Sequence, residues 1–183
     1  EQLKTEKNKN ISNFNYLNWQ NKLSSQNLNA PYLVLYNASG KDANATIVKR
    51  EDLDLEFIVE SKTYVYYTEN IKEAYYLTAI LNSSVPNLMI KDFQTRGLFG
   101  PRDIHKKILN VYFPKFDNKN KTHLHLADIS EKAHSIVANY IKDNPQNSDL
   151  RPTQLGRLRI DVKKQIEKEI KEIDNIVKKI VGK

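Results

Sequence analysis

A cationic segment, residues 91–107 (KDFQTRGLFGPRDIHKK), holds the side chains of this sequence that are best suited to chemistry. It carries five lysines and arginines against two aspartates, with Gln, Thr and His between them. Arg fits phosphates and guanine edges, Gln suits adenine, and Lys attracts phosphates without reading sequence. Two glycines, Gly97 and Gly100, let the backbone approach a ligand closely. The segment therefore predicts nucleic-acid contact, and the alternative is a solvated loop whose Arg and Asp side chains pair internally.

Charge and geometry divide the candidate DNA-contacting residues into groups. The candidates for phosphate contact are the cations Arg96, Arg102, Lys106 and Lys107, with Lys91 as a further cation of the segment. The candidates for base edges are the polar side chains Gln94, Thr95 and His105. Secondary candidates lie in an earlier turn, at Asn37, Ser39 and Lys41. Structural roles are expected for Gly97 and Gly100 in the loop, and for Asp103 as the internal partner of Arg102.

An acidic stretch upstream suggests a second chemistry. Asp52 or Asp54, followed by Glu60 and Lys62 at the end of an expected strand, could hold Mg²⁺ while the lysine polarises an attacking water. Restriction-type nucleases use such an arrangement. The alternative is a turn of solvated acids that leads into a strand with a polar face. A Mg²⁺-dependent nuclease that uses Asp54, Glu60 and Lys62 is therefore kept as the alternative function.

Other catalytic chemistries find no support. His123 and His125 would share one face of a strand, as metal ligands must, but no third ligand is indicated. His134 has no Ser or Cys partner in a recognisable motif. The absence of cysteine excludes disulfides, thiol catalysis and Cys-based metal sites, and five glycines do not supply a nucleotide-binding loop. We expect no catalytic residue, metal or cofactor in this chain.

Length and charge set the class of protein. The 183 residues suit one domain with a helical appendage, and a net charge of +7 favours polyanionic partners. No apolar run approaches the roughly 18 residues of a membrane span, and the start lacks the apolar core of a signal peptide. We therefore expect a soluble cytoplasmic protein with no membrane contact. A start without an initiator Met suggests a fragment of a longer protein.

The elements that must position the candidate residues begin at Pro31. β-Branched and aromatic runs predict an antiparallel meander of strands at 32–36, 46–49, 55–59 and 63–68. Helical spacing then predicts a helix from Ile71 through Leu81, a short helix capped by Ser84 with Pro86 in its first turn, and a third helix over 126–141. Between the second and third of these helices, the residue types at 108–113 predict a strand. The expected core residues are Leu77, Leu81, Val111 and Phe113.

The tail predicts one amphipathic helix of about 30 residues, with apolar residues spaced by three and four from Leu155 to Ile180. It either packs on its own domain or forms a coiled-coil arm for another helix. The fold class is therefore α+β, with a small mixed or antiparallel sheet, packed helices and a long C-terminal helix. The expected divisions are a connector over 1–30, an α/β domain over 31–145 and the helical arm over 150–183.

Three passages resemble the target-recognition (DNA specificity) domain of N6-adenine DNA methyltransferases from prokaryotic restriction–modification systems. Such domains occur at the C-terminal end of fused type II enzymes and, more distantly, in type I specificity subunits. The passages are VLYNASGK at 34–41, EAYYLTAILNS at 73–83, and FQTRG at 93–97 with RDIHKK at 102–107 and FPKF at 113–116. Together they span about residues 31–140 in the right order.

The resemblance implies an α/β domain that reads duplex DNA and delivers an adenine to a separate catalytic domain, which flips it from the stack. S-Adenosylmethionine is implied for the parent enzyme, and the implied partners are double-stranded DNA and a methyltransferase or restriction catalytic domain. The methylation motif, Asn or Asp before Pro-Pro-Tyr or Phe, is absent, because Asn144-Pro145-Gln146-Asn147 departs at its third position. The resemblance therefore implies a chain that binds DNA and is not catalytic alone.

Overall fold

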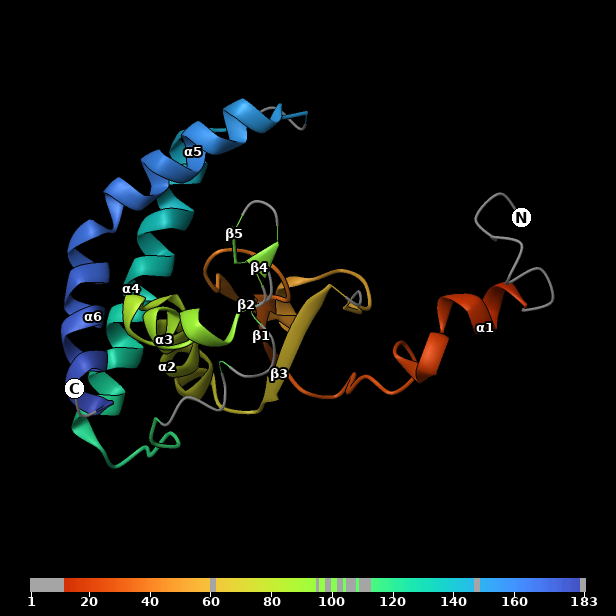
Figure 1. Ribbon diagram of the computed structural model, residues 1–183, viewed down its shortest axis with the longest axis horizontal. Helices are drawn as coiled ribbons and strands as arrows, with labels where there is room; N and C mark the ends of the chain where they lie inside the picture. The colour runs from red at the N-terminus through yellow and green to blue at the C-terminus, as the bar shows by residue number, and fades with distance from the viewer. Residues whose placement is uncertain are drawn as a thin grey trace.

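The computed structural model describes residues 12–59, 62–94, 96–97, 100–101, 104, 108, 113–146 and 149–181. The fold is α+β, in which a three-stranded antiparallel sheet packs against helices and is followed by the C-terminal helices α5 (Pro152–Gln165) and α6 (Glu167–Ile180) (Figure 1). This confirms the predicted fold class. Two short helices, α1 (Asn13–Leu17) and η2 (Trp19–Asn21), precede the sheet and lie away from the helical layer in Figure 1.

The sheet has the order β2-β1-β3, so the first strand is central. Its strands are β1 (Tyr32–Asn37), β2 (Ala45–Lys49) and β3 (Thr63–Thr68), each antiparallel to its neighbour. Three of the predicted strands are thereby confirmed. Leu33 and Val34 are both fully buried, which shows that the central strand is covered on both faces.

The strand predicted at 55–59 is wrong, because side chains bind the backbone groups that a strand would need. The short helix η3 (Arg50–Asp52) leads into this stretch. Gln26 donates from Nε2 to the Val59 carbonyl (2.8 Å) and accepts from the Val59 N–H at Oε1 (2.7 Å). Arg50 donates from Nη1 to the Phe57 carbonyl (2.9 Å). Side chains of the lead-in and of η3 therefore hold this stretch, and no strand ladder forms there.

Polar caps set where the central helices begin. α2 (Ile71–Asn82) starts after Asn70, whose Oδ1 accepts from the N–H groups of Lys72 and Glu73, as the predicted boundary requires. α3 (Ser84–Met89) holds Pro86 in its first turn, but its cap is Ser83 and not Ser84, because Ser83 Oγ accepts from the Val85 N–H. α4 (Lys121–Asp143) begins five residues before the predicted start, since Asn120 caps it.

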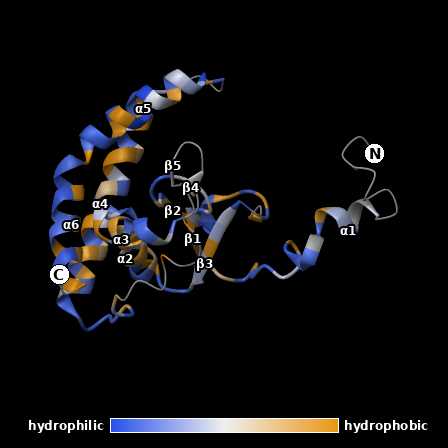
Figure 2. Cartoon of the chain, in the orientation of Figure 1, coloured by the Kyte–Doolittle hydropathy of each residue, from blue (hydrophilic) through white to orange (hydrophobic). Residues whose placement is uncertain are grey.

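Two apolar clusters share α2, which lies between the sheet and the outer helices. One joins the sheet to α2 and to Ile90, Ile104 and Ile108, and the other joins α2 to α4 and α6. Figure 2 shows hydrophobic residues along α2, α4 and α6. Leu77 and Leu81 are buried as predicted, and Phe113 is partly buried against both clusters. Val111, with most of the strand predicted at 108–113, lies outside the described residues.

The tail forms two helices, α5 (Pro152–Gln165) and α6 (Glu167–Ile180), rather than one. The break is at Ile166, whose φ of −112° and ψ of 18° are not helical. α6 packs into the body, because Ile173 and Val177 are buried in the cluster with α2 and α4. Glu169 pairs with Lys132 of α4 at 2.9 Å. α6 therefore takes the first of the two expected arrangements, and α5 has no buried residue.

Candidate nucleic-acid interface

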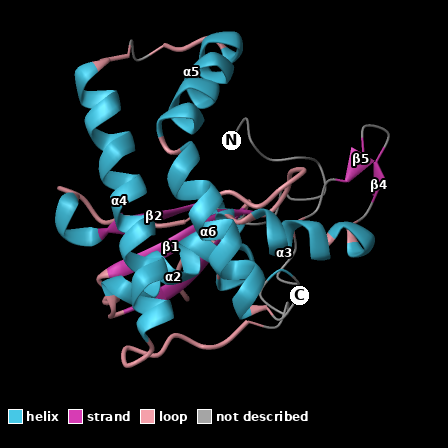
Figure 3. Ribbon diagram, turned by 90° about the vertical axis from the view of Figure 1, so that its left-hand side faces the viewer, coloured by secondary structure: helices cyan, strands magenta, loops and turns pink. Residues whose placement is uncertain are grey.

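The cationic segment forms a hairpin at its centre. β4 (Arg96–Gly97) pairs antiparallel with β5 (Gly100–Pro101), so that Arg96 lies opposite Pro101 and Gly97 opposite Gly100. Buried residues stand on either side of the hairpin in the sequence: Ile90 before it, and Ile104 and Ile108 after it, each at most 2% exposed. The hairpin is thus anchored in the core at both ends, and Figure 3 shows it standing apart from the helical layer.

The loop between β1 and β2, residues 38–44, is closed by one side chain. Asn37 donates from Nδ2 to the carbonyls of Ser39 (2.8 Å) and Asp42 (3.2 Å), and its Oδ1 accepts from the Asn44 N–H (2.7 Å). Gly40 has a φ of +149°, and a Cβ there would lie 2.7 Å from Asn37 Nδ2. The loop therefore requires glycine at this position and asparagine at the end of β1.

This loop and the base of the hairpin are bonded to each other. The short helix η4 (Lys91–Phe93) places Lys91 Nζ 2.7 Å from Asp42 Oδ1 and within hydrogen-bond distance of the Lys41 carbonyl. Gln94 donates weakly to the carbonyls of Gly40 (3.4 Å) and Lys41 (3.5 Å). The Ile104 N–H donates to the Ala38 carbonyl at 3.1 Å. Two passages predicted separately as DNA contacts thus form one unit.

The predicted site residues fall into three groups. Ser39 and Lys41 have exposed side chains, and the contacts named above use only their carbonyls. Asn37, Lys91 and Gln94 hold the loop internally, and Gln94 is only 6% exposed. Among the described residues, Gln94 Oε1 is buried without a partner. Only the backbone of Arg96 is described, and the residues outside the described chain are Thr95, Arg102, Asp103, His105, Lys106 and Lys107.

A groove of about 590 Å³ lies beside this unit, and the sequence patterns did not predict it. Its walls come from Asp42–Thr46, α2, α3, α4 and the α5–α6 junction. Asn82 covers the outer edge of β2 there, because its carboxamide accepts from the Ala45 N–H (2.8 Å) and donates to the Ala45 carbonyl (2.9 Å). Asn87 likewise accepts from the Ala43 N–H (2.7 Å). No sequence motif marks the groove, since its residues come from distant segments.

The residues of the alternative nuclease site are only partly described. Asp54 and Lys62 have exposed side chains, whereas Glu60 lies outside the described residues. Within the part of the chain that is described, no group of three or more His, Cys, Asp or Glu side chains could hold a metal ion. The nuclease alternative stays a prediction.

The paired histidines lie on α4 rather than on a strand, so they do not share a face. His123 is buried, and its Nδ1 accepts from the Asp117 N–H (3.1 Å). Burial lowers the pKa of His123. His125 lies 3.1 Å from Glu172 of α6. Both rings therefore have structural partners.

No family model, curated protein or solved structure matches this chain. In the described ranges, no helix is both long and apolar enough to cross a membrane.

Proposed function

We propose that this chain binds duplex DNA in a sequence-specific manner, as the target-recognition domain of an N6-adenine methyltransferase from a restriction–modification system. The observation that carries the proposal is the contact between the β1–β2 loop and the base of the β4–β5 hairpin. Residue chemistry and the resemblance indicate both segments as DNA contacts, and Lys91 joins them through Asp42 and the Lys41 carbonyl.

The internal bonds of the unit support a preorganised binding surface. Asn37, Lys91 and Gln94 use their polar atoms to hold the loop, so ordering that loop does not have to accompany DNA binding. The side chains of Ser39 and Lys41 are left exposed beside the hairpin. In this proposal the hairpin enters a groove of the duplex, Arg96 and Arg102 bind phosphates, and Lys41 contacts the flanking backbone.

The methyl transfer itself belongs to a separate catalytic domain in this proposal. That domain holds S-adenosylmethionine and flips the target adenine, and the present chain selects the site in the cytoplasm of the host. The chain alone binds DNA and transfers no methyl group. A parent enzyme that also cuts DNA would use the same recognition step.

A salt titration with matched variants tests the proposal. Affinity for duplex DNA should fall steeply between about 50 and 200 mM salt, because phosphate contacts release counterions. Lys41→Ala and Arg96→Ala should each lower affinity and reduce the salt slope by about 0.9. Lys41→Ala removes an exposed side chain and leaves the carbonyl bonded to Lys91, so the loop should persist.

Lys178→Ala is the matched control, because this exposed lysine lies near the C-terminal end of α6, away from the hairpin in Figure 1. Its affinity for DNA should equal that of the wild type. Salt-independent binding, or equal affinity for all three variants, would rule out the proposed function.

A further inference from the structure

The positive charge of this protein is concentrated in two segments. The cationic segment 91–107 has five basic and two acidic residues, and α5 has four basic and one acidic residue, so each carries +3 of the net +7. α4 and α6 each contain as many acids as bases. The first segment is the proposed hairpin contact. The second concentration of positive charge lies on α5, which has no role in the proposed function.

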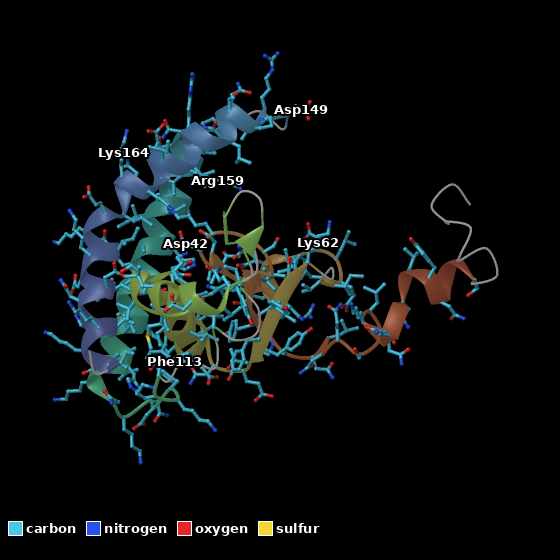
Figure 4. All side chains as sticks on the ribbon, in the orientation of Figure 1. Asp42, Lys62, Phe113, Asp149, Arg159 and Lys164 are labelled. Carbon is cyan, nitrogen blue, oxygen red and sulfur yellow. The ribbon has the colours of Figure 1, made fainter. Side chains whose placement is uncertain are left out.

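α5 presents part of this charge toward the groove. Leu158 and Val162 are its partly buried apolar residues, and one side of the helix next to them carries Arg159 and Lys163, four residues apart. Lys163 lines the groove together with Asp42–Thr46 of the β1–β2 loop and β2. Figure 4 places Arg159 on the inner side of α5 and Lys164 on its outer side. The inner side therefore carries two cations, Arg159 and Lys163.

α5 and the β4–β5 hairpin rise on the same side of the molecule, above the level of α3 (Figures 1 and 3). They are separate projections, because α5 packs mainly against the neighbouring helices α4 and α6 and has no buried residue among those described. Two cationic elements that project from one side of the protein can each contact a phosphate strand of a duplex, because two such strands run on either side of each groove.

A glycine, Gly156, lies inside α5. It lies three residues before Arg159 and seven before Lys163, so it shares their side of α5. A Cβ built at Gly156 would meet nothing within 4 Å. Glycine inside a helix lowers stability relative to alanine, and here no contact within the described chain requires it. The absence of a side chain at Gly156, beside two cations, instead leaves room for the sugar–phosphate backbone of a nucleic acid to approach the helix.

We propose that the inner face of α5, formed by Gly156, Arg159 and Lys163, is a second phosphate-binding surface for the duplex held by the hairpin. Arg159 and Lys163 bind backbone phosphates, and Gly156 lets the strand approach the helix closely. This inference rests on the proposed function and adds a contact to it. It predicts that α5 contributes affinity and salt dependence but no sequence preference.

The test uses the full chain and a labelled random-sequence duplex of about 30 base pairs, long enough to reach both projections. Arg159→Ala with Lys163→Ala should weaken binding about tenfold and reduce the salt slope by about 2. Arg159→Lys with Lys163→Arg should restore most of the affinity. Lys164→Ala is the control, because Lys164 lies on the outer side of α5 and is 3.3 Å from Asp161.

The Gly156→Ala variant distinguishes an effect on DNA affinity from an effect on the stability of the fold. The melting temperature should rise, because alanine favours the helix and meets no neighbour. DNA affinity should nevertheless fall severalfold, because the methyl group obstructs the approaching strand. A merely structural glycine would give higher stability with unchanged affinity, and that result would overturn the inference.

The two proposals fail in different ways. If Arg96→Ala weakens binding while the Arg159 and Lys163 double variant binds as the wild type does, the second surface is wrong and the proposed function stands. Unchanged affinity of the double variant would mean that the inner face of α5 is exposed to solvent or binds a protein partner. If the wild-type chain shows no salt-dependent binding to duplex DNA, both proposals are wrong.

Discussion

Lys91 of η4 and Asp42 of the β1–β2 loop form an ion pair, with 2.7 Å between Nζ and Oδ1. The pair joins residues far apart in sequence and connects the base of the hairpin to the loop. Its side chains are 26% and 47% exposed, so solvent screens the attraction and its main effect is on position. The Lys41 carbonyl is a further acceptor for the same ammonium group.

A double-mutant cycle on Lys91 and Asp42 should reveal this coupling. We expect a coupling energy below about 1 kcal/mol in urea unfolding, as for other partly exposed pairs. Lys91→Ala should also weaken DNA binding more than its charge alone predicts, because the loop that carries Lys41 loses an anchor. Additive unfolding energies, together with a loss of affinity no larger than that of Lys41→Ala, would contradict the positional role.

Gly40→Ala should destabilise the β1–β2 loop. A methyl group at φ +149° would lie 2.7 Å from Asn37 Nδ2, so either the backbone or the closing asparagine must move. We expect a loss of about 1–3 kcal/mol of unfolding free energy, which is typical of a strained backbone conformation. Thermal unfolding measures it. Gly156→Ala is the contrasting glycine substitution, since it should raise stability.

Acidification should destabilise the protein through His123. Burial lowers the pKa of this ring in the folded state, and its Nδ1 must stay unprotonated to accept from the Asp117 N–H. The unfolded chain therefore binds the proton more readily, and stability should fall as the pH drops through about 6.5, the ordinary histidine value. Asp117 opposes this shift, while the rings of Tyr76 and Phe116 lie beside the imidazole.

Urea unfolding of wild type and His123→Gln at several pH values checks this expectation. The amide oxygen of glutamine can accept a hydrogen bond but does not titrate in this range. The variant should therefore show a flatter dependence of stability on pH between about 7.5 and 5.5. Parallel curves for the two proteins would show that another group is responsible.

Asp174 should be important for holding α6 on the body. Its Oδ1 accepts from Ser83 Oγ and from the Ser84 N–H, and its Oδ2 accepts from Ser84 Oγ, all at 2.8 Å. Hydrogen bonds to a charged group contribute about 1.5–3 kcal/mol, so Asp174→Ala should lower the unfolding free energy by about that amount. Asn175→Ala, at the exposed neighbouring position, is the control. Equal stability of the two variants would mean that apolar packing alone holds α6.

Local sequence patterns predict an element correctly where the residues of that element and its immediate neighbours determine its structure. The β-branched and aromatic composition predicts the strand at 63–68, and the change of period after Asn70 predicts the helix that begins at Ile71. The strand at 55–59 failed because Arg50 and Gln26 bind its backbone from a distance. The apolar spacing continues through Ile166, so it does not predict the break between α5 and α6 there.

The candidate site was predictable as residue chemistry but not as geometry. The mixture of cations and glycines indicated the segment, and the turn at Asn37 was visible on its own. Their contact depends on Lys91 and Asp42, and nothing in the local sequence connects those residues. The groove is not predictable for the same reason, and the apolar spacing of the tail does not indicate the cationic side of α5.

The carboxamide of Asn82 has a consequence beyond the fold of a single molecule. An uncovered outer strand is a template on which another chain can align, and this is a common route to aggregation. By pairing with both backbone groups of Ala45, Asn82 acts as a one-residue substitute for a fourth strand and blocks such growth at that position. The covered edge therefore hinders strand pairing between copies of this chain at Ala45.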